Sequence, residues 1–492
     1  MKLHSLIAKL PFAKVVGKEG NPEIENIEQD HRKVNNGTLF VCIEGENFDG
    51  HQFAKDAQSK GAVAIVASKP VDVDIPVVMV KDTNRAMAIL ADCFYDHPSH
   101  KLFLVGITGT NGKTSVSHIT QHLFNVARKR TGLIGTLYTI IGEHTYETKN
   151  TTPDSLTLQK TFHKMVSSNT EVVSMEVSSH ALVNGRVWGS DFDIAVFTNL
   201  TQDHLDFHKT MEEYKRAKGL FFTGLGFKYD PLKPKYAVLN GDDPVSSEYE
   251  KLTNAHIIKY GLNSQFDVYA SDIQMTNKGT TFTLHTPVGT TQVSINLIGI
   301  FNVYNCLAAV SVGLAYGLPL SDIAYGLTTF KGVPGRFELV NEDQPFPIIV
   351  DYAHTPDSLE NVLKTIKSMA KGKIFVVVGC GGDRDKTKRP KMAKIACQYA
   401  TDAIFTSDNP RSEDPLEILK DMEAGVQGES YKVIPDREQA IKFAVQSAGP
   451  HDVVLIAGKG HETYQIIGDR TLDFDDRVVA RNAVKEIKNH YL

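Results

Sequence analysis

The stretch GITGTNGKTS at residues 106–115 decides the fold class of this chain. The apolar run LFLV precedes it, so we predict a strand, a glycine-rich loop and the start of a helix, in that order. Backbone N–H groups of such a loop, the helix N-terminus and the Lys113 ammonium together bind phosphate oxygens, and the Thr114 hydroxyl is placed to contact Mg²⁺. The motif departs from a strict G-x-x-x-x-G-K-[ST], because Gly106 comes one residue too early. The run TGTNGKT nevertheless disfavours a plain strand–turn–helix junction.

The loop alone does not say whether the nucleotide is hydrolysed, donates its phosphate or drives bond formation. The composition of the chain excludes some classes of protein. The chain has 492 residues, 41% hydrophobic and 23% charged, which is typical of a globular protein of about three domains. Its net charge of −5 argues against a nucleic-acid binder. Lys9 and Lys14 interrupt any N-terminal apolar segment, and no apolar run reaches the ~18 residues of a membrane span. We therefore expect a cytoplasmic protein with reduced cysteines.

The pattern of apolar runs and helical stretches predicts an α/β fold in three domains. We expect a first domain at 1–99, a central P-loop-type ATPase domain with a mostly parallel sheet at 100–333, and a Rossmann-like C-terminal domain at 334–492. The segment KGVPGRF at 331–337 has the Gly/Pro pattern of an interdomain hinge.

Polar residues follow the predicted strands of the central domain, where ligands bind in parallel sheets. Glu176 ends the run VVSME, and the segment TNLTQDHLDFH places Asp203 and His204 after another strand. A carboxylate and a histidine beside a phosphate loop suit Mg²⁺ held jointly with phosphate oxygens. HLDFH could instead be a zinc pair, but a metalloprotease needs Glu where this chain has Leu205. A further alternative is that Asp206 and His208 only cap and orient this loop.

Four apolar runs of the third domain also end in polar clusters. Their members are Asp351, His354, Arg384, Asp408, Asn409, Arg411, Lys459, His461 and Glu462. Both signs of charge are present, which suits a zwitterion whose carboxylate binds arginine and whose ammonium binds glutamate. We expect residues 386–389 to be a solvated charged turn. An ATP site and an amino-acid site in one chain indicate a ligase, which activates a carboxylate by phosphoryl transfer before an amine attacks it. A nucleotide-dependent switch without chemistry is the alternative from another class.

Several motifs together resemble the Mur ligase family of peptidoglycan synthesis over essentially the whole chain. They are TGTNGKTS, NTTP, MEVSSHAL, TNLTQDHLDFH, YKRAK, GIFNVYNCLAA, GVPGRFE, DYAHTPDS, GCGGDRD, DNPR and GKGHE. The resemblance implies ATP-dependent addition of meso-diaminopimelate to UDP-N-acetylmuramoyl-L-alanyl-D-glutamate through an acyl phosphate. The first domain would then hold the uridine nucleotide, the central domain ATP, and the third the incoming amino acid. The protein is expected to be a monomer.

The resemblance also implies site residues. Catalytic roles fall to Lys113, Glu176, His204 and Lys218. ATP would be bound by Gly109, Thr110, Asn111, Gly112, Lys113, Thr114, Ser115, Asn302, Arg336, Asp351 and His354. The UDP-linked substrate would be bound by Asp30, His31, Arg32, Thr151, Thr152, Ser178, Asn184 and Arg186. Diaminopimelate would be bound by Arg384, Asp408, Asn409, Pro410, Arg411, Gly458 and Glu462.

Two Mg²⁺ ions are implied in the same way. Thr114 and Glu176 would hold the first, and His204 the second. Lys218 matches the family's carbamylated lysine, in which carbon dioxide converts a cation into an anion that supports the second ion. Without the resemblance, Lys218 would be read as an exposed surface lysine.

Two positions depart from the family pattern. His31 stands where a serine is usual, although an imidazole can still donate a hydrogen bond, and Asn184 stands where some relatives have Gln. The DNPR segment bears on the choice of amino acid. If L-lysine bound, Arg411 would lose its anionic partner, at a cost of ~2–5 kcal/mol or roughly thirty- to several-thousand-fold in affinity. We therefore expect diaminopimelate. The alternatives are a lysine-adding member of the family and, more distantly, a ligase of the folylpolyglutamate synthetase type.

Overall fold

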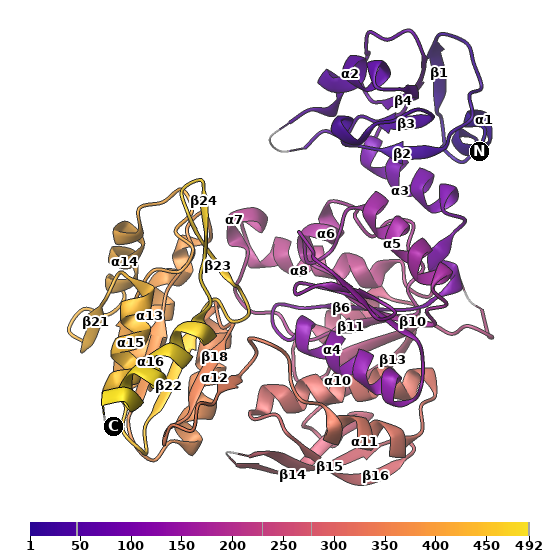
Figure 1. Cartoon of the computed structure of the whole chain (residues 1–492). Helices are drawn as coiled ribbons and strands as arrows, with labels where there is room; N and C mark the ends of the chain where they lie inside the picture. Colours follow the sequence, from indigo (N-terminus) through magenta and orange to yellow (C-terminus); the bar gives the residue numbers. More distant parts are fainter. Residues whose placement is uncertain (46–47, 229, 277, 491–492) are drawn as a thin grey trace. The chain divides into compact units, whose positions relative to one another are not determined.

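The computed structural model describes residues 1–45, 48–228, 230–276 and 278–490 (Figure 1). The chain forms two compact units. Unit 1 contains Met1–Thr108, Arg128–Ala195 and Leu220–Lys235, and unit 2 contains Gly109–Ala127, Val196–Gly219 and Tyr236–Leu492. Strand β11 (Ile194–Phe197) and helix α8 (Met211–Thr223) include residues of both units.

The first part of unit 1 is a five-stranded sheet with the order β1-β5-β4-β3-β2, in which only β1 runs antiparallel to its neighbour. Its strands are β1 (Lys14–Gly17), β2 (Asn26–Glu28), β3 (Thr38–Val41), β4 (Ala62–Ala67) and β5 (Pro76–Met79). Its helices are α1 (Leu3–Ile7), η1 (His31–Lys33), η2 (Gly50–Phe53), α2 (Ala54–Ser59) and α3 (Thr83–Phe94). Leu39 packs in one apolar cluster and Phe40 in another, so the sheet is buried on both faces.

The second part of unit 1 has a parallel core extended by an antiparallel edge. Strand β10 pairs in parallel with β6 and β7, and β8 and β9 continue from β7 in antiparallel pairs. These strands are β6 (Phe103–Thr108), β7 (Thr131–Ile134), β8 (Thr139–Ile141), β9 (His144–Tyr146) and β10 (Val172–Glu176). The accompanying helices are η3 (Pro98–Lys101), α5 (Ser155–Ser167) and α6 (Ser179–Val183). Glu176 is thereby placed at the carboxyl end of a buried strand.

The first part of unit 2 carries the helix that follows the glycine-rich loop. Its helices are α4 (Lys113–Val126), α7 (Leu205–His208), α9 (Ser246–Tyr249), η4 (Glu250–Leu252), α10 (Ile300–Tyr316) and α11 (Leu320–Thr329). Its strands are β12 (Tyr236–Asn240), β13 (His256–Gly261), β14 (Val268–Thr276), β15 (Gly279–Thr286) and β16 (Gly289–Ile295). Strands β12 to β14 pair in parallel, and β14 to β16 form an antiparallel meander. Helices α4 and α10 pack against each other.

The C-terminal part of unit 2 is a six-stranded sheet with the order β17-β18-β22-β19-β20-β21, parallel except for β17. The strands are β17 (Glu338–Val340), β18 (Ile348–Asp351), β19 (Ile374–Val378), β20 (Asp402–Phe405), β21 (Tyr431–Val433) and β22 (Val453–Ala457). A separate hairpin contains β23 (Tyr464–Ile467) and β24 (Arg470–Asp473). The helices are α12 (Pro356–Met369), η5 (Lys386–Lys388), α13 (Arg389–Tyr399), α14 (Pro415–Glu423), α15 (Arg437–Ser447) and α16 (Asp476–His490).

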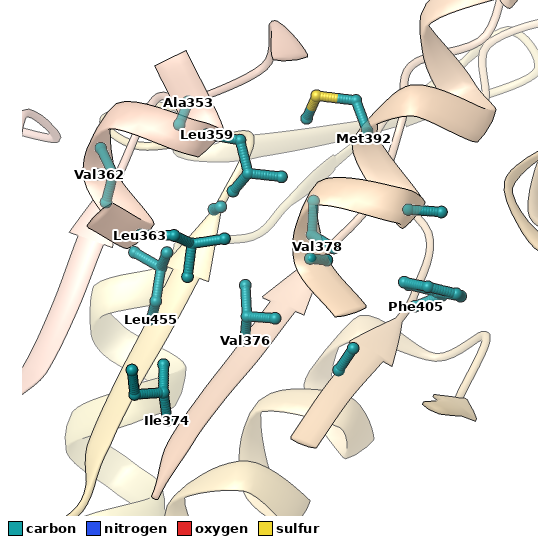
Figure 2. Packing of buried hydrophobic residues seen from close by; sticks show 14 of the residues in the cluster. Ala353, Leu359, Val362, Leu363, Ile374, Val376, Val378, Met392, Phe405 and Leu455 are labelled. Carbon is teal, nitrogen blue, oxygen red and sulfur yellow. The ribbon is translucent and has the colours of Figure 1, made fainter. Parts of the chain in front are cut away.

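Alternate residues of β19 fill two apolar clusters on opposite faces of this sheet. Ile374, Val376 and Val378 pack with residues of α12 and α13 (Figure 2), whereas Phe375 and Val377 pack with residues of α15 and α16. Because both faces are covered, the strand is a continuous apolar run, and polar side chains are displaced to its ends. This arrangement places the candidate site at the strand ends.

These sheets and helices confirm the predicted α/β fold with mostly parallel sheets. The domain boundaries at 99 and 333 stay predictions. All five cysteines are free thiols, and three of them are buried. Among the described residues, no helix is both long and apolar enough to cross a membrane.

Candidate active site

The glycine-rich loop runs from the end of β6 to Gly112, which caps the N-terminus of α4. Gly109 has a φ of 148°, and a Cβ at this position would overlap the Thr198 hydroxyl oxygen. The loop is held from one side, because Thr198 Oγ1 donates to Asn111 O at 2.6 Å and Asn111 N donates to Asn199 Oδ1 at 2.9 Å. The loop is thereby fixed in a shape that only glycine at 109 permits.

The charged and hydroxyl groups of the loop lie together. Lys113 Nζ donates to Gly109 O at 2.9 Å and to Thr110 O at 2.8 Å, so the ammonium folds back over the loop. Thr114 and Ser115 are buried in the first turn of α4. A cation, backbone N–H groups and a helix N-terminus of this kind form an anion site.

Arg336 extends this group from the segment between the two parts of unit 2. Its Nη2 donates to Thr114 Oγ1 at 3.1 Å, and its guanidinium carbon lies 4.4 Å from the centre of the Tyr352 ring. Its Nε is buried and has no hydrogen-bond partner in the described part of the chain. A buried guanidinium donor without a protein acceptor fits a phosphate oxygen.

Two further residues expected at ATP are engaged within the protein. Asn302 Nδ2 donates to Ile298 O at 2.9 Å, and Asn302 Oδ1 accepts from Asn305. Asp351 ends β18 and accepts from Phe337 N at 2.6 Å. Burial raises the pKa of Asp351, although Arg336 opposes that shift. Asp351 therefore connects the end of β18 to the segment that carries Arg336.

Asp203 lies close to two histidines and a lysine from two parts of unit 2. His204 Nε2 lies 3.3 Å from its carboxylate, His354 Nε2 lies 3.6 Å away, and Lys388 Nζ lies 3.5 Å away. Burial alone would raise the pKa of Asp203, but His204, His354 and Lys388 hold it well below its usual value. His354 Nδ1 lies 2.8 Å from Tyr352 O, which orients the ring. Sequence reasoning placed Asp203 at a strand end but gave it no role.

The prediction that 386–389 is a solvated turn is wrong for Lys388 and Arg389. Their side chains are 7% and 1% exposed, respectively. Arg389 binds both carboxylate oxygens of Glu413 at 2.9 and 3.0 Å, and Asp421 at 2.8 Å. These carboxylates balance the buried charge. They come from α14 and the turn before it, so the charge run itself gave no sign of its burial.

Lys218 is buried rather than exposed, with a relative accessibility of 1%. Its Nζ donates to Gly109 O at 2.8 Å and lies 4.4 Å from the centre of the Tyr214 ring. Among the described residues, no carboxylate forms an ion pair with it. Burial, with the Lys113 charge, holds the pKa of Lys218 well below its usual value, although Asp203 acts in the opposite direction. Burial and Lys113 therefore favour the neutral amine more than in a free lysine, and the neutral amine is the form that reacts with carbon dioxide.

A second group of expected site residues lies within unit 1. The buried Glu176 carboxylate accepts from Thr136 N at 2.8 Å and from Thr136 Oγ1 at 3.0 Å. Thr152 Oγ1 donates to Glu176 O at 2.9 Å, and Arg186 Nη1 donates to Thr152 O at 3.1 Å. Ser178 N donates to Thr152 Oγ1 at 3.0 Å, and the Ser178 side chain caps α6. Thr151 Oγ1 lies 3.1 Å from Thr136 Oγ1. The fold therefore gathers Thr151, Thr152, Glu176, Ser178 and Arg186.

The other residues expected at the UDP-linked substrate have their own local contacts. Arg32 forms a two-point ion pair with Asp30, at 2.9 Å for each contact, and lowers the pKa of Asp30 to about 2. The His31 ring lies 4.1 Å from the Phe53 ring, both centre to centre. Asn184 is exposed at the end of α6. No hydrogen bond or ion pair between described residues joins Asp30, His31 or Arg32 to the Thr152 group.

The residues expected at the incoming amino acid converge in unit 2. Asn409 Nδ2 donates to Glu462 Oε2 at 2.8 Å, and Lys459 Nζ donates to Asn409 Oδ1 at 3.2 Å and Glu462 Oε2 at 3.0 Å. Gly458 N donates to Asp351 O at 3.1 Å, which ties this loop to β18. Burial raises the pKa of Glu462, Asp408 adds to the shift, and Lys459 opposes it. Lys459, which is completely buried, belongs to this group, as its place in the predicted polar cluster indicated, although it was not among the residues expected to bind diaminopimelate.

The side chains of the two arginines in this group are held by different contacts. Arg411 has a φ of 50°, and its Nη1 donates to Gly382 O at 2.8 Å. Arg384 is exposed, and its Nη1 donates to the neighbouring Asp383 O at 2.9 Å. Pro410 is buried between Asn409 and Arg411. Arg411 is therefore held by the backbone of the Gly-Gly turn, whereas Arg384 projects from it.

Two glycines bring the Arg336 segment against the loop of Glu462. A Cβ at Gly335 would overlap His461 N, and a Cβ at Gly460 would lie 2.7 Å from Gly335 O. Gly335 O also accepts from Tyr352 N at 2.9 Å. Burial lowers the pKa of His461 to about 3, with help from Arg336, so this imidazole is neutral near pH 7. The two backbones are in direct contact.

Family sequence models match most of the chain. The Mur ligase middle domain matches residues 107–313, the glutamate ligase domain of Mur ligases matches 335–460, and the catalytic domain of the Mur ligase family matches 23–95.

Relatives and a solved structure agree with these matches. The chain is 57% identical over 488 residues to UDP-N-acetylmuramoyl-L-alanyl-D-glutamate--2,6-diaminopimelate ligase of Bacillus licheniformis, covering 99% of this chain and 100% of the relative. It is 58% identical over 487 residues to the protein of that name from Bacillus velezensis, covering 99% of each. A solved structure of that name is 34% identical, covers 94% of this chain and 95% of its own, and has a TM-score of 0.68. The chain therefore belongs to the Mur ligase family.

Proposed function

We propose that this chain is an ATP-dependent ligase that adds meso-diaminopimelate to UDP-N-acetylmuramoyl-L-alanyl-D-glutamate. The reaction would serve peptidoglycan precursor synthesis in the bacterial cytoplasm. We also propose that the protein acts as a monomer, with the three domains bounded near residues 99 and 333. The relatives of this name, which match over nearly the full chain, support the proposal.

One observation carries the proposal at the level of the residues. Unit 2 contains both a phosphate-binding loop and a group of both charge signs around Asn409, Arg411 and Glu462. A switch needs the first of these but has no use for the second. Arginine suits the carboxylate of an amino acid, and glutamate suits an ammonium group. The two together fit a reaction that consumes ATP and an amino acid.

The chemistry would proceed in two steps. The γ-phosphate of ATP is transferred to the side-chain carboxylate of the D-glutamyl residue, which gives ADP and an acyl phosphate. The amine of diaminopimelate then attacks the acyl carbon and loses a proton, and the carbon–oxygen bond to phosphate breaks. Lys113 and the loop amides would hold the β- and γ-phosphates, and Arg336 would contact a phosphate oxygen. Holding both reactants together supplies much of the rate enhancement.

Mg²⁺ stays the proposed metal ion. Thr114 and Glu176 stay its proposed oxygen ligands, because hydroxyl and carboxylate oxygens are the ligands that Mg²⁺ prefers. His204 stays the proposed contact of a second ion. Bound Mg²⁺ would neutralise charge on the transferring phosphoryl group.

Lys218 stays the proposed carbamate. Its burial without a carboxylate partner among the described residues, and its lowered pKa, support a group whose charge carbon dioxide would change. The carbamate oxygens would supply the anionic ligands that a lysine lacks.

The test is phosphate release from ATP in the presence of the UDP-linked dipeptide, with meso-diaminopimelate or L-lysine added in parallel. We expect release with diaminopimelate, little release with lysine, and a product heavier than the dipeptide by one diaminopimelate residue. Release with lysine alone would keep the ligase and contradict the amino acid that we propose. If neither amino acid causes phosphate release in protein that binds ATP, the proposed function is overturned in favour of a nucleotide-dependent switch.

A further inference from the structure

A fully buried ion pair lies beneath the proposed amino-acid site. Arg437, the first residue of α15, and Asp476, the first residue of α16, both have completely buried side chains. Arg437 Nε donates to Asp476 Oδ1 at 2.8 Å, and Arg437 Nη2 donates to Asp476 Oδ2 at 2.7 Å. This two-point geometry fixes the plane of the guanidinium.

The same guanidinium also holds the backbone at two strand ends. Arg437 Nη2 donates to Ala457 O at 3.0 Å, and Arg437 Nη1 donates more weakly to Ser407 O at 3.4 Å. Ala457 ends β22 and directly precedes Gly458, whereas Ser407 follows β20 and directly precedes Asp408. Arg437 thus contacts the last carbonyl before each of the two loops that carry the proposed diaminopimelate residues.

The strand pairs of the described sheet do not join these two loops at the strand ends, whereas further along the loops Asn409 contacts both Lys459 and Glu462. Strand β19 lies between β20 and β22, so the ends of β20 and β22 are two strand spacings, or ~10 Å, apart. A long side chain from outside the sheet can span that separation. Arg437 does so from the start of α15.

The charge of Arg437 also acts on the site. Burial by itself would lower the pKa of Arg437, but Asp476, and beyond it Asp408 and Glu462, raise it. By the same interaction, the guanidinium favours the ionised form of Glu462. It therefore opposes the effect of burial on Glu462, the residue proposed to bind an ammonium group.

Stability alone does not account for such a pair. Replacing a buried ion pair by apolar residues of similar volume is often neutral or stabilising, whereas removing one partner is strongly destabilising. We propose that Arg437, oriented by Asp476, is a positioning residue that sets the Asp408 and Glu462 loops for the incoming amino acid. This inference rests on the proposed function, because it assigns the pair to the amino-acid step.

The test uses a variant that removes both charges together, Arg437→Met with Asp476→Leu. Phosphate release is measured with each of the three substrates varied in turn. We expect the KM for meso-diaminopimelate to rise roughly tenfold or more, as for a lost positioning contact of ~1.4 kcal/mol, with KM for ATP and for the UDP-linked dipeptide nearly unchanged. Asp476→Glu keeps the charge but lengthens the side chain, and we expect a smaller rise in the same KM. This milder variant decides the question if the double variant does not fold.

The matched control is a largely buried ion pair of unit 1, Lys235 with Asp193, at 2.9 Å. Lys235→Met with Asp193→Asn should lower the thermal midpoint without changing the KM for diaminopimelate. A folded Arg437/Asp476 variant with an unchanged KM for diaminopimelate would overturn the inference alone. Equal losses with all three substrates would also overturn it, since they indicate a general structural role. A wild-type protein that does not respond to diaminopimelate would overturn the proposed function, and this inference with it.

Discussion

Replacing Arg411 by methionine should remove the preference for diaminopimelate while leaving the fold intact. Methionine keeps much of the side-chain length, and it meets the same backbone strain as arginine at a φ of 50°. What the variant loses is the guanidinium, which would pair with the carboxylate that diaminopimelate has and lysine lacks. The variant therefore separates recognition from folding.

The size of the effect follows from the surroundings of Arg411. Truncating a buried, hydrogen-bonded charge pair costs ~2–5 kcal/mol. Arg411 is only partly buried, and its Nη1 already donates to Gly382 O. The lower part of that range is therefore appropriate, about 2–3 kcal/mol, which is roughly a 30- to 150-fold rise in KM.

The assay is phosphate release at saturating ATP and UDP-linked dipeptide, with meso-diaminopimelate or L-lysine varied. The KM for diaminopimelate should rise by the factor above, and that for lysine should stay nearly the same. Arg470→Met is the matched control, since Arg470 is exposed on the neighbouring hairpin. Equal changes for the two amino acids, or no change for diaminopimelate, would refute the assignment of Arg411.

Three further outcomes are expected. Arg389→Met should lower the free energy of unfolding by about 3 kcal/mol in chemical denaturation. This is the low end for breaking a buried ion pair, because Asp421 is half exposed. A change below ~0.5 kcal/mol would indicate that Arg389 lies in an exposed turn instead. The Arg389 contact lowers the pKa of Glu413 to about 2, so its stabilisation is complete above the unfolded pKa of ~4.3 and is lost as the pH falls toward 2; acid titration of wild type and Arg389→Met should converge there. Lys218→Ala should abolish phosphate release while ATP still binds. The wild-type activity should fall in carbon-dioxide-free buffer and recover when bicarbonate is added. A wild-type activity that does not change with bicarbonate would contradict the carbamate.

Much of the fold and of the candidate site follows from one property of parallel sheets. Buried strands are continuous apolar runs, so the first polar residue after a run marks a strand end. That rule placed Glu176, Asp351 and Asp408 at or just beyond strand ends, where the structure has them. The glycine-rich loop could also be recognised from the sequence, because its residue spacing and its lysine are local features.

Burial of charge was not predictable in the same way. The run 386–389 has the composition of an exposed turn, and Arg389 is buried only because Glu413 and Asp421 meet it from another segment. Arg437 and Asp476 were missed because they begin helices rather than end strands. Pairing between distant segments depends on the tertiary fold, which spacing along the chain does not encode.

The contact between Gly335 and Gly460 has a thermodynamic consequence. Arg336, next to Gly335, contacts the phosphate loop, and Gly460 lies in the loop that carries Glu462. Because no side chain separates the two backbones, a ligand that displaces one of them displaces the other. By linkage, if the bound amino acid changes the affinity for the nucleotide by some factor, the bound nucleotide changes the affinity for the amino acid by the same factor. An inhibitor lodged against residue 460 would therefore weaken nucleotide binding without touching the nucleotide pocket, and its potency would fall as the nucleotide concentration rises.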